Sequence, residues 1–173
     1  YMLDRFIVVF DHSYDPLGKG WQQSRSLLAI GSGGVFGQGY MQGTQTHSSY
    51  RTNLPARHTD LIFAVCGEEL GLVGCLAVMA LLAAIIFRVL TVAKRAETPF
   101  QSNVCVGMAA MLIFQTAINI GMCLFVVPVI GITLPFFSYG GSSIVTLFAA
   151  MGVGSSIKKR SPTMRRTAHL LGS

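Results

Sequence analysis

Residues 54–87 read LPARHTDLIFAVCGEELGLVGCLAVMALLAAIIF, and this stretch decides the fold. After Asp60 the sequence is almost wholly apolar from Leu61 to Phe87. At about 1.5 Å per residue, this run is long enough to cross the hydrocarbon core of a bilayer, which is about 30 Å thick. We therefore expect a membrane-spanning helix with Asp60 at its mouth, at the boundary between water and lipid.

The composition of the whole chain agrees with a membrane protein. The 173 residues are 51% hydrophobic and only 12% charged, whereas an ordinary soluble domain carries about 25% charged residues. The net charge of +6 does not indicate nucleic-acid binding, because the basic residues cluster just after the last apolar segment. That position is typical of a cytoplasmic helix end, with contact to anionic lipids as the alternative. The cluster comprises Lys158, Lys159, Arg160, Arg165 and Arg166.

The positions of the four cysteines indicate buried apolar residues. Cys66, Cys75, Cys105 and Cys123 all fall within apolar runs, and none forms a CxxC pair. We interpret them as small buried hydrophobic residues, not as disulfides or metal ligands. The chain begins at Tyr1 and opens without a signal peptide, so we expect it to be the carboxyl-terminal part of a longer protein.

The sequence predicts an all-α polytopic membrane fragment of about three spans in three regions. Residues 1–60 form an extracytoplasmic loop region, in which residues 21–30 are either a short interfacial helix or a plain surface helix. Residues 61–157 hold the membrane helices, with spans expected at about 60–90, 102–127 and 141–157. A re-entrant-like outer loop is expected at 128–140, because two prolines and the glycines around it exclude a regular span. Residues 158–173 form a basic cytoplasmic tail.

A glycine-rich stretch, residues 31–39, lies in the outer region. It fails the GxGxxG pattern because Phe36 stands where the third glycine should be, so nucleotide binding is unsupported. Gly33 and Gly34 still allow close backbone approach. The approaching group is either another helix or a ligand, and the sequence leaves both open.

The first span carries a glycine face below Asp60. At 100° per residue, Gly67 and Gly71 each lie 20° from Asp60, and together they form the GxxxG pattern of close helix packing. Asp60 is therefore expected to face the protein interior. Glu69 points to the opposite side, and Glu68 lies between, about 12 Å deeper than Asp60 by the helical rise. We interpret both glutamates as structural hydrogen-bonding groups, not as acid/base partners of Asp60.

The second span carries two amides on one face. Gln115 and Asn119 are spaced i, i+4, and amides at that spacing usually hold helices together. Contact with substrate is the alternative.

Six motifs occur in an order that closely resembles the carboxyl-terminal half of the SEDS family (shape, elongation, division and sporulation), up to about Lys159. They are Asp15-Pro-Leu-Gly, Ile30-Gly-Ser-Gly-Gly, Leu54-Pro with His58-Thr-Asp, Gly67-Glu-Glu-Leu-Gly, Asn119-Ile-Gly-Met and Leu134-Pro-Phe-Phe-Ser-Tyr-Gly-Gly-Ser-Ser. Residues 42–47, QGTQTH, resemble the RodA, or elongation, branch more than the FtsW, or division, branch. Departures from the usual pattern, such as Ala56 where many members have Glu, leave Asp60 in place.

The resemblance implies a ten-helix membrane glycosyltransferase of the bacterial cytoplasmic membrane. Such enzymes polymerise the lipid II disaccharide-pentapeptide on the extracytoplasmic side, extend an undecaprenyl pyrophosphate-linked glycan, and work with a class B penicillin-binding protein. The family's essential acid falls on Asp60, which suits a general base for the attacking sugar hydroxyl. A divalent cation, Mg²⁺ or Mn²⁺, is implied by the family alone. The candidate substrate-binding residues are Arg57, His58, Arg25, Gly33, Gly34, Ser138, Tyr139 and Ser142.

Two other functions fit parts of the sequence. A lipid II flippase or transporter would also use intramembrane acids and glycine-broken loops, and a non-catalytic scaffold of the elongation or division machinery would need neither. A translocation path predicts polar residues through the full depth of one face. The polar residues concentrate instead on the outer side, thinning below Glu69, Gln115 and Asn119, which favours chemistry at the membrane surface.

Overall fold

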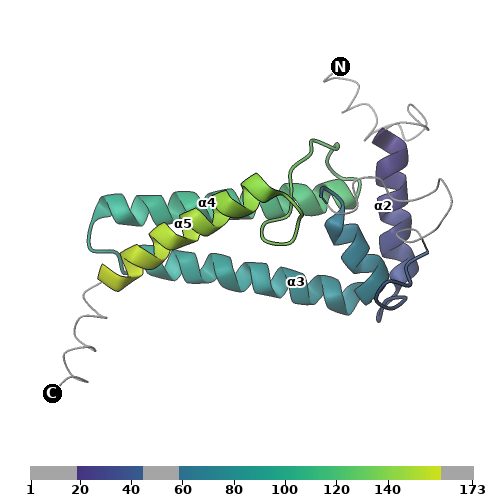
Figure 1. Cartoon of the computed structure of the whole chain (residues 1–173), viewed down its shortest axis with the longest axis horizontal. Helices are drawn as coiled ribbons and strands as arrows, with labels where there is room; N and C mark the ends of the chain where they lie inside the picture. Colours follow the sequence, from purple (N-terminus) through teal and green to yellow (C-terminus); the bar gives the residue numbers. More distant parts are fainter. Residues whose placement is uncertain (1–18, 45–58, 161–173) are drawn as a thin grey trace.

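The computed structural model describes residues 19–44 and 59–160, and within these residues the secondary structure is helical. The elements in chain order are α2 (Lys19–Gly33), α3 (Ile62–Lys94), α4 (Pro99–Cys123) and α5 (Gly141–Arg160). Figure 1 shows α3 and α4 running as a long pair, α5 crossing that pair, and α2 lying across one end of it. The predicted all-α class is confirmed.

Two of the described helices, α3 and α4, are long and apolar enough to cross a membrane. They match the first two predicted spans, and a short turn that contains Arg95 joins Lys94 to Pro99. Thr98 caps α4 by accepting a hydrogen bond from the Gln101 amide at 3.3 Å, and Pro99 occupies the first turn, where its missing N–H costs nothing. α5 follows the predicted third segment, but its crossing of the membrane stays a prediction.

The prediction that the first span is one regular helix is wrong. Gly71 has φ 68° and ψ −163° inside α3, a conformation open essentially to glycine alone. The chain changes direction there (Figure 1). We call residues 62–70 the short arm of α3 and residues 72–94 its long arm. The angular positions derived from 100° per residue therefore hold only within the short arm, from Ile62 to Leu70.

The glycine-rich loop closes this break. A break frees backbone groups that would cost free energy if they were buried without partners. Here the backbone of the loop supplies the partners. Its carbonyls accept from two amides of the long arm, and its amides donate to two carbonyls of the short arm. The bonds are Leu72 N to Gly34 O at 3.0 Å, Val73 N to Val35 O at 3.2 Å, Gln38 N to Glu68 O at 2.9 Å and Gly39 N to Glu69 O at 3.1 Å.

Glycines permit this close approach, as predicted, but they do so in two ways. A Cβ at Gly67 would lie 3.0 Å from Ile30 Cγ1, and one at Gly33 would collide with the Gly67 carbonyl, so α2 packs directly on the short arm. A Cβ at Gly71 would instead collide with the amide of Gly37. Gly67 thus lets two helices pack closely, whereas Gly71 allows the break in α3.

α2 is a packed element, not a plain surface helix. Gln23, Ser26 and Ala29 share one face and are buried. Gln23 Nε2 donates to the carbonyls of Met122 at 3.2 Å and Val127 at 2.7 Å, and Ser26 Oγ donates to the Cys123 carbonyl at 2.9 Å. These side chains bond to carbonyls at and just after the carboxyl end of α4, where a helix runs out of amide donors of its own. The Met122 carbonyl also accepts from the Phe125 amide at 3.3 Å.

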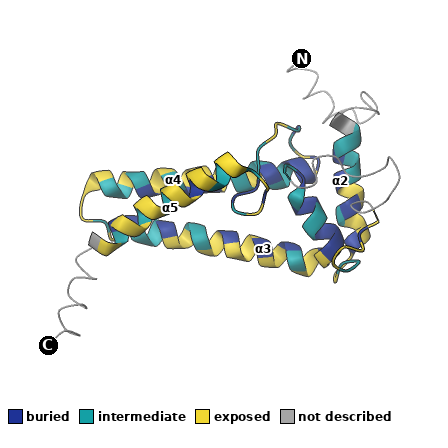
Figure 2. Ribbon diagram, viewed as in Figure 1, coloured by how far each residue is buried: buried dark blue, intermediate teal, exposed yellow. Residues whose placement is uncertain are grey.

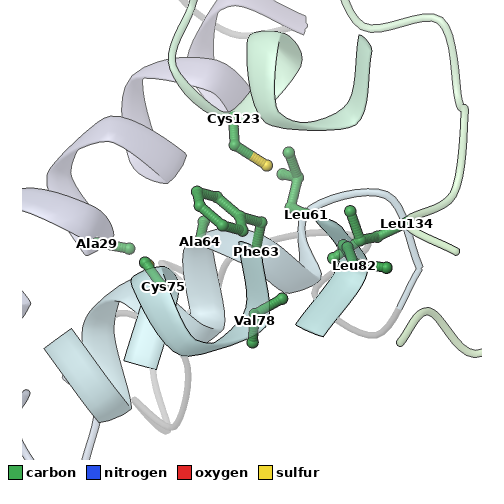
Figure 3. Packing of buried hydrophobic residues seen from close by; sticks show 9 residues of the cluster. All are labelled: Ala29, Leu61, Phe63, Ala64, Cys75, Val78, Leu82, Cys123 and Leu134. Atoms are coloured by element: carbon green, nitrogen blue, oxygen red, sulfur yellow. The ribbon is translucent and has the colours of Figure 1, made fainter. Parts of the chain in front are cut away.

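The main core lies where α2, α3 and the end of α4 meet. Figure 3 shows its buried residues: Ala29, Leu61, Phe63, Ala64, Cys75, Val78, Leu82, Cys123 and Leu134. A smaller cluster at the other end joins α3, α4 and α5 through Val89, Ala93, Cys105, Ala109 and Ile157. Much of the long arm and of α5 is exposed (Figure 2). Three of the cysteines are buried, Cys66 is half-buried, and all four are free thiols, which confirms that they are not disulfides.

Candidate functional site

Asp60 lies half-buried in the turn that leads into α3. Its backbone carbonyl accepts a hydrogen bond from Asn119 Nδ2 of α4 at 2.9 Å. The preceding carbonyl, of Thr59, accepts from Ser138 Oγ at 2.6 Å. Two successive carbonyls of this turn are thus held by side chains from two distant parts of the chain.

The same two side chains also hold the segment between α4 and α5. Asn119 Nδ2 donates to the Ile132 carbonyl at 2.8 Å, and Ser138 Oγ accepts from the Leu134 amide at 2.7 Å. Both side chains are buried. The turn at Asp60, the end of α4 and residues 132–138 therefore form one hydrogen-bonded unit.

The Asp60 carboxylate lies beside Gly131. A Cβ built at Gly131 would be 3.6 Å from Asp60 Oδ2, and Gly131 has φ +87° and is exposed. A side chain at this position would be strained because φ is positive. The main-chain position of Asp60 is thus held by hydrogen bonds, and its carboxylate lies next to the exposed backbone of the loop.

The two glutamates lie on the short arm and are buried. Glu68 Oε1 accepts from Thr44 Oγ1 at 3.3 Å, so this acid bonds to the segment that follows the glycine-rich loop. Glu68 therefore has a hydrogen-bond partner within the chain itself. This contact is of the structural kind that we predicted for Glu68.

The other predicted site residues are dispersed. Arg57 and His58 lie outside the described residues. The Arg25 guanidinium lies over the Trp21 ring, 5.5 Å from its centroid. Tyr139 and Ser142 are exposed where α5 begins, and Gln115 is half-buried on α4.

Three predicted substrate-binding residues have structural contacts. Gly33 packs on Gly67, the Gly34 carbonyl accepts from Leu72, and Ser138 bonds to backbone on both sides. These contacts favour packing as the reason for the glycine-rich stretch. Substrate contact by these three residues stays a prediction.

Sequence reasoning missed three contributors. Gly131 was seen only as a helix breaker, although a glycine between two apolar residues of a loop is a signal for close approach. Gln23 and Ser26 were missed as a buried pair, although their spacing with Ala29 places them on one helix face.

A metal site is not assembled by the described parts of the chain. Residues 19–44 and 59–160 contain no group of three or more His, Cys, Asp or Glu side chains that could hold a metal ion.

The comparison with protein families is decisive. The model of the FtsW/RodA/SpoVE cell cycle proteins matches residues 1–162. The chain belongs to this family. The FtsW/RodA/SpoVE proteins are the SEDS family, so the resemblance seen in the sequence is confirmed, and with it a place in a family of polytopic membrane proteins.

Individual relatives come from several branches. The peptidoglycan glycosyltransferase MrdB of Escherichia coli K12 is 44% identical over 91% of the chain, the RodA of Treponema pallidum 36% over 92%, and the probable FtsW of Bacillus subtilis 40% over 86%. The chain spans only 42%, 36% and 37% of these FtsW/RodA/SpoVE proteins.

A solved structure shares the fold. Its title describes the coordination of polymerization and crosslinking by a peptidoglycan synthase complex. One of its chains aligns with a TM-score of 0.72 and 31% identity over 92% of this chain, and the alignment covers 42% of that chain.

Proposed function

We propose that the protein containing this chain is a peptidoglycan glycosyltransferase that polymerises lipid II, with Asp60 as its general base. Relatives that match nine-tenths of the chain carry the name peptidoglycan glycosyltransferase. The observation that carries the proposal is the position of Asp60: its backbone is held by Asn119, and its carboxylate lies beside the exposed Gly131.

This geometry suits glycosyl transfer at a membrane surface. The acceptor sugar hydroxyl loses its proton to the Asp60 carboxylate while its oxygen bonds to the anomeric carbon of the donor. The bond from that carbon to the lipid pyrophosphate breaks, and the pyrophosphate leaves with the electron pair. Direct displacement inverts the anomeric carbon and needs no covalent intermediate on the protein. Charge on the leaving group calls for cationic or N–H donors, and we propose Arg57, His58 and Arg25 as candidates.

The setting of the reaction belongs to the same proposal. We place the protein in the bacterial cytoplasmic membrane with Asp60 on the extracytoplasmic side. A class B penicillin-binding protein is the proposed partner, supported by the solved complex whose title pairs polymerization with crosslinking. A divalent cation stays a prediction for the whole protein, and no step above depends on it.

The test is lipid II polymerisation by the full-length protein with Asp60→Asn. This change keeps size and polarity but removes the base, so the rate should fall about 10²–10⁴-fold. Glu97→Gln is the matched control, because Glu97 is an exposed carboxylate in the turn between α3 and α4, and it should retain wild-type activity. Near-normal polymer from Asp60→Asn, at equal protein amount and equal partner binding, would refute the assignment and favour the flippase or scaffold functions.

A further inference from the structure

The long arm of α3 is by itself long enough to cross the bilayer. From Leu72 to Lys94 it extends about 34 Å, and α4 extends about 37 Å beside it. Both lengths match a hydrocarbon core of about 30 Å. Lys94 and Arg95 mark one end of the long arm, so the break at Gly71 marks the opposite membrane boundary. The buried glutamates of the short arm therefore lie at that boundary and not deep within the span, where the sequence had placed them.

The glycine-rich loop is held at this same boundary. Its carbonyls at Gly34 and Val35 accept from Leu72 and Val73, the first two residues of the long arm. Figure 1 shows α2, which leads into the loop, lying across the end of the α3–α4 pair. An element that crosses the ends of two spanning helices runs along the membrane surface, as predicted for an interfacial helix.

The loop exposes large apolar side chains at this membrane boundary. Phe36 is 84% exposed and Tyr40 78% exposed, and Val35 and Met41 are exposed as well. From Ser26 to Tyr50 the sequence contains no Asp, Glu, Lys or Arg. Leu72 and Val73, bonded to the loop, are also exposed, so the apolar surface continues from the loop onto the spanning helix.

We propose that residues 35–41 form an interfacial anchor that inserts into the outer leaflet of the membrane, with Phe36 and Tyr40 at headgroup depth. Aromatic residues are enriched at that depth, because their rings tolerate contact with both acyl chains and water. An uncharged apolar surface of this kind marks an interaction site. The lipid surface is the occupant that this position fits, since the loop is bonded to the first turn of a bilayer-length helix.

The anchor would serve the neighbouring site. Its loop closes the break in α3, and the short arm above the break begins at the turn that carries Asp60. Insertion would hold the short arm at a fixed height over the membrane, where a lipid-linked substrate arrives. The inference rests on the two spans and not on transferase activity, so failure of the Asp60 assignment would leave it standing.

The test measures the surroundings of the loop in the full-length protein in lipid nanodiscs. Phe36→Cys and Tyr40→Cys, each in a background with the other cysteines replaced, carry a nitroxide spin label. Its collisions with oxygen, which partitions into lipid, are compared with collisions with a water-soluble nickel chelate. Glu97→Cys, in the exposed turn between α3 and α4, is the aqueous reference.

At both loop positions we expect the spin label to collide more often with oxygen than with the nickel chelate. At Glu97 we expect more collisions with the nickel chelate. Labels at Phe36 and Tyr40 that collide mainly with nickel would place the loop in water and overturn the proposal. Labels shielded from both reagents would show that protein covers the loop, which also overturns it. Measuring two positions keeps the test decisive if one variant fails to fold.

Discussion

Asp60 owes its position to residues far from it in the sequence. Asn119 is 59 residues away and holds the Asp60 carbonyl, while Ser138 holds the adjacent carbonyl of Thr59. Both bonds engage backbone carbonyls, so they fix the main-chain position from which the Asp60 side chain extends. The carboxylate oxygens are not used by these bonds. A base that is preorganised in this way can be aligned with a sugar hydroxyl, and misplacement by about 1 Å can cost about 10²-fold in rate.

Asn119→Ala should therefore reduce kcat by about 10-fold or more, with a smaller change in the KM for lipid II. It also removes the Asn119 donor from the carbonyls of Asp60 and Ile132, and the Asp60 carbonyl keeps a weak contact with the Cys123 thiol at 3.9 Å. The expected cost is about 1–3 kcal/mol in stability. Gln115→Ala, which removes an amide one helical turn earlier, is the control and should change neither parameter much. The measurement is steady-state polymerisation with purified full-length variants matched for folded protein. A raised KM with unchanged kcat would show that Asn119 does not position the base.

Part of this role could be predicted from the sequence. The i, i+4 spacing of Gln115 and Asn119 indicated a structural amide face, and Asn119 donates to two backbone carbonyls. Its partners could not be predicted, because they are carbonyls of a turn and of an irregular loop, where no periodic pattern reports which atoms meet. The acid itself was identified by its position before an apolar run and by its motif.

At the scale of an element, α3 is two helices joined by one glycine. The GxxxG spacing of Gly67 and Gly71 predicted a single groove, yet only Gly67 packs as part of a helix. The GxxxG spacing is the same for a continuous helix and for a helix broken at Gly71. The two structures differ only in the backbone conformation of that one residue. The second span was predicted to begin at about residue 102 from hydropathy. The helix α4 begins slightly earlier, at Pro99, because Thr98 caps it and Pro99 suits its first turn.

Gly71→Ala should lower stability by about 1–3 kcal/mol, because φ 68° with ψ −163° is strained for any residue with a Cβ. Steric conflict with the backbone at Gly37 adds to this cost. Gly107→Ala is the matched control, since Gly107 lies within α4 and a Cβ there meets nothing within 4 Å. It should leave stability unchanged or raise it by up to about 1 kcal/mol. Thermal unfolding of the full-length protein in detergent checks both, and equal melting temperatures would contradict the proposed need for glycine at 71.

At the scale of the whole molecule, the described chain is a pair of candidate spans, α3 and α4, with α5 packed against both and a cap at one end. The cap consists of α2, the glycine-rich loop and the short arm, and it carries Asp60 at its junction with α4. Composition and hydropathy predicted the membrane class and about three spans, because hydropathy is a property of whole segments. Two of the described helices, α3 and α4, are long and apolar enough for such spans, and the third span stays a prediction. The cap could not be predicted, since it depends on bonds between segments about 100 residues apart.

The three-span topology gives a labelling prediction. Cysteines at Glu97 and Lys159, which follow α3 and end α5, should react with an impermeant maleimide only after the membrane is permeabilised, because basic residues favour the cytoplasmic side. A cysteine at Gln42, which is exposed in the segment after the glycine-rich loop, should react in cells with an opened outer envelope and an intact inner membrane. Opposite behaviour at Glu97 and Lys159 would show that α5 does not cross the membrane.

Synthesis of the chain separates α2 from its docking partners in time. Gln23 and Ser26 bond to carbonyls that lie 97–104 residues later in the chain, and at about 5–20 residues per second the ribosome needs about 5–20 s to deliver them. The loop can already pair with α3, whose contacting residues follow about 30–40 residues after it. The cap therefore assembles in two stages: the break at Gly71 is closed first, and α2 is locked only after α4 has been inserted. Until then the Asp60 carbonyl lacks the hydrogen bond from Asn119, so the proposed base takes up its aligned position only late in biogenesis.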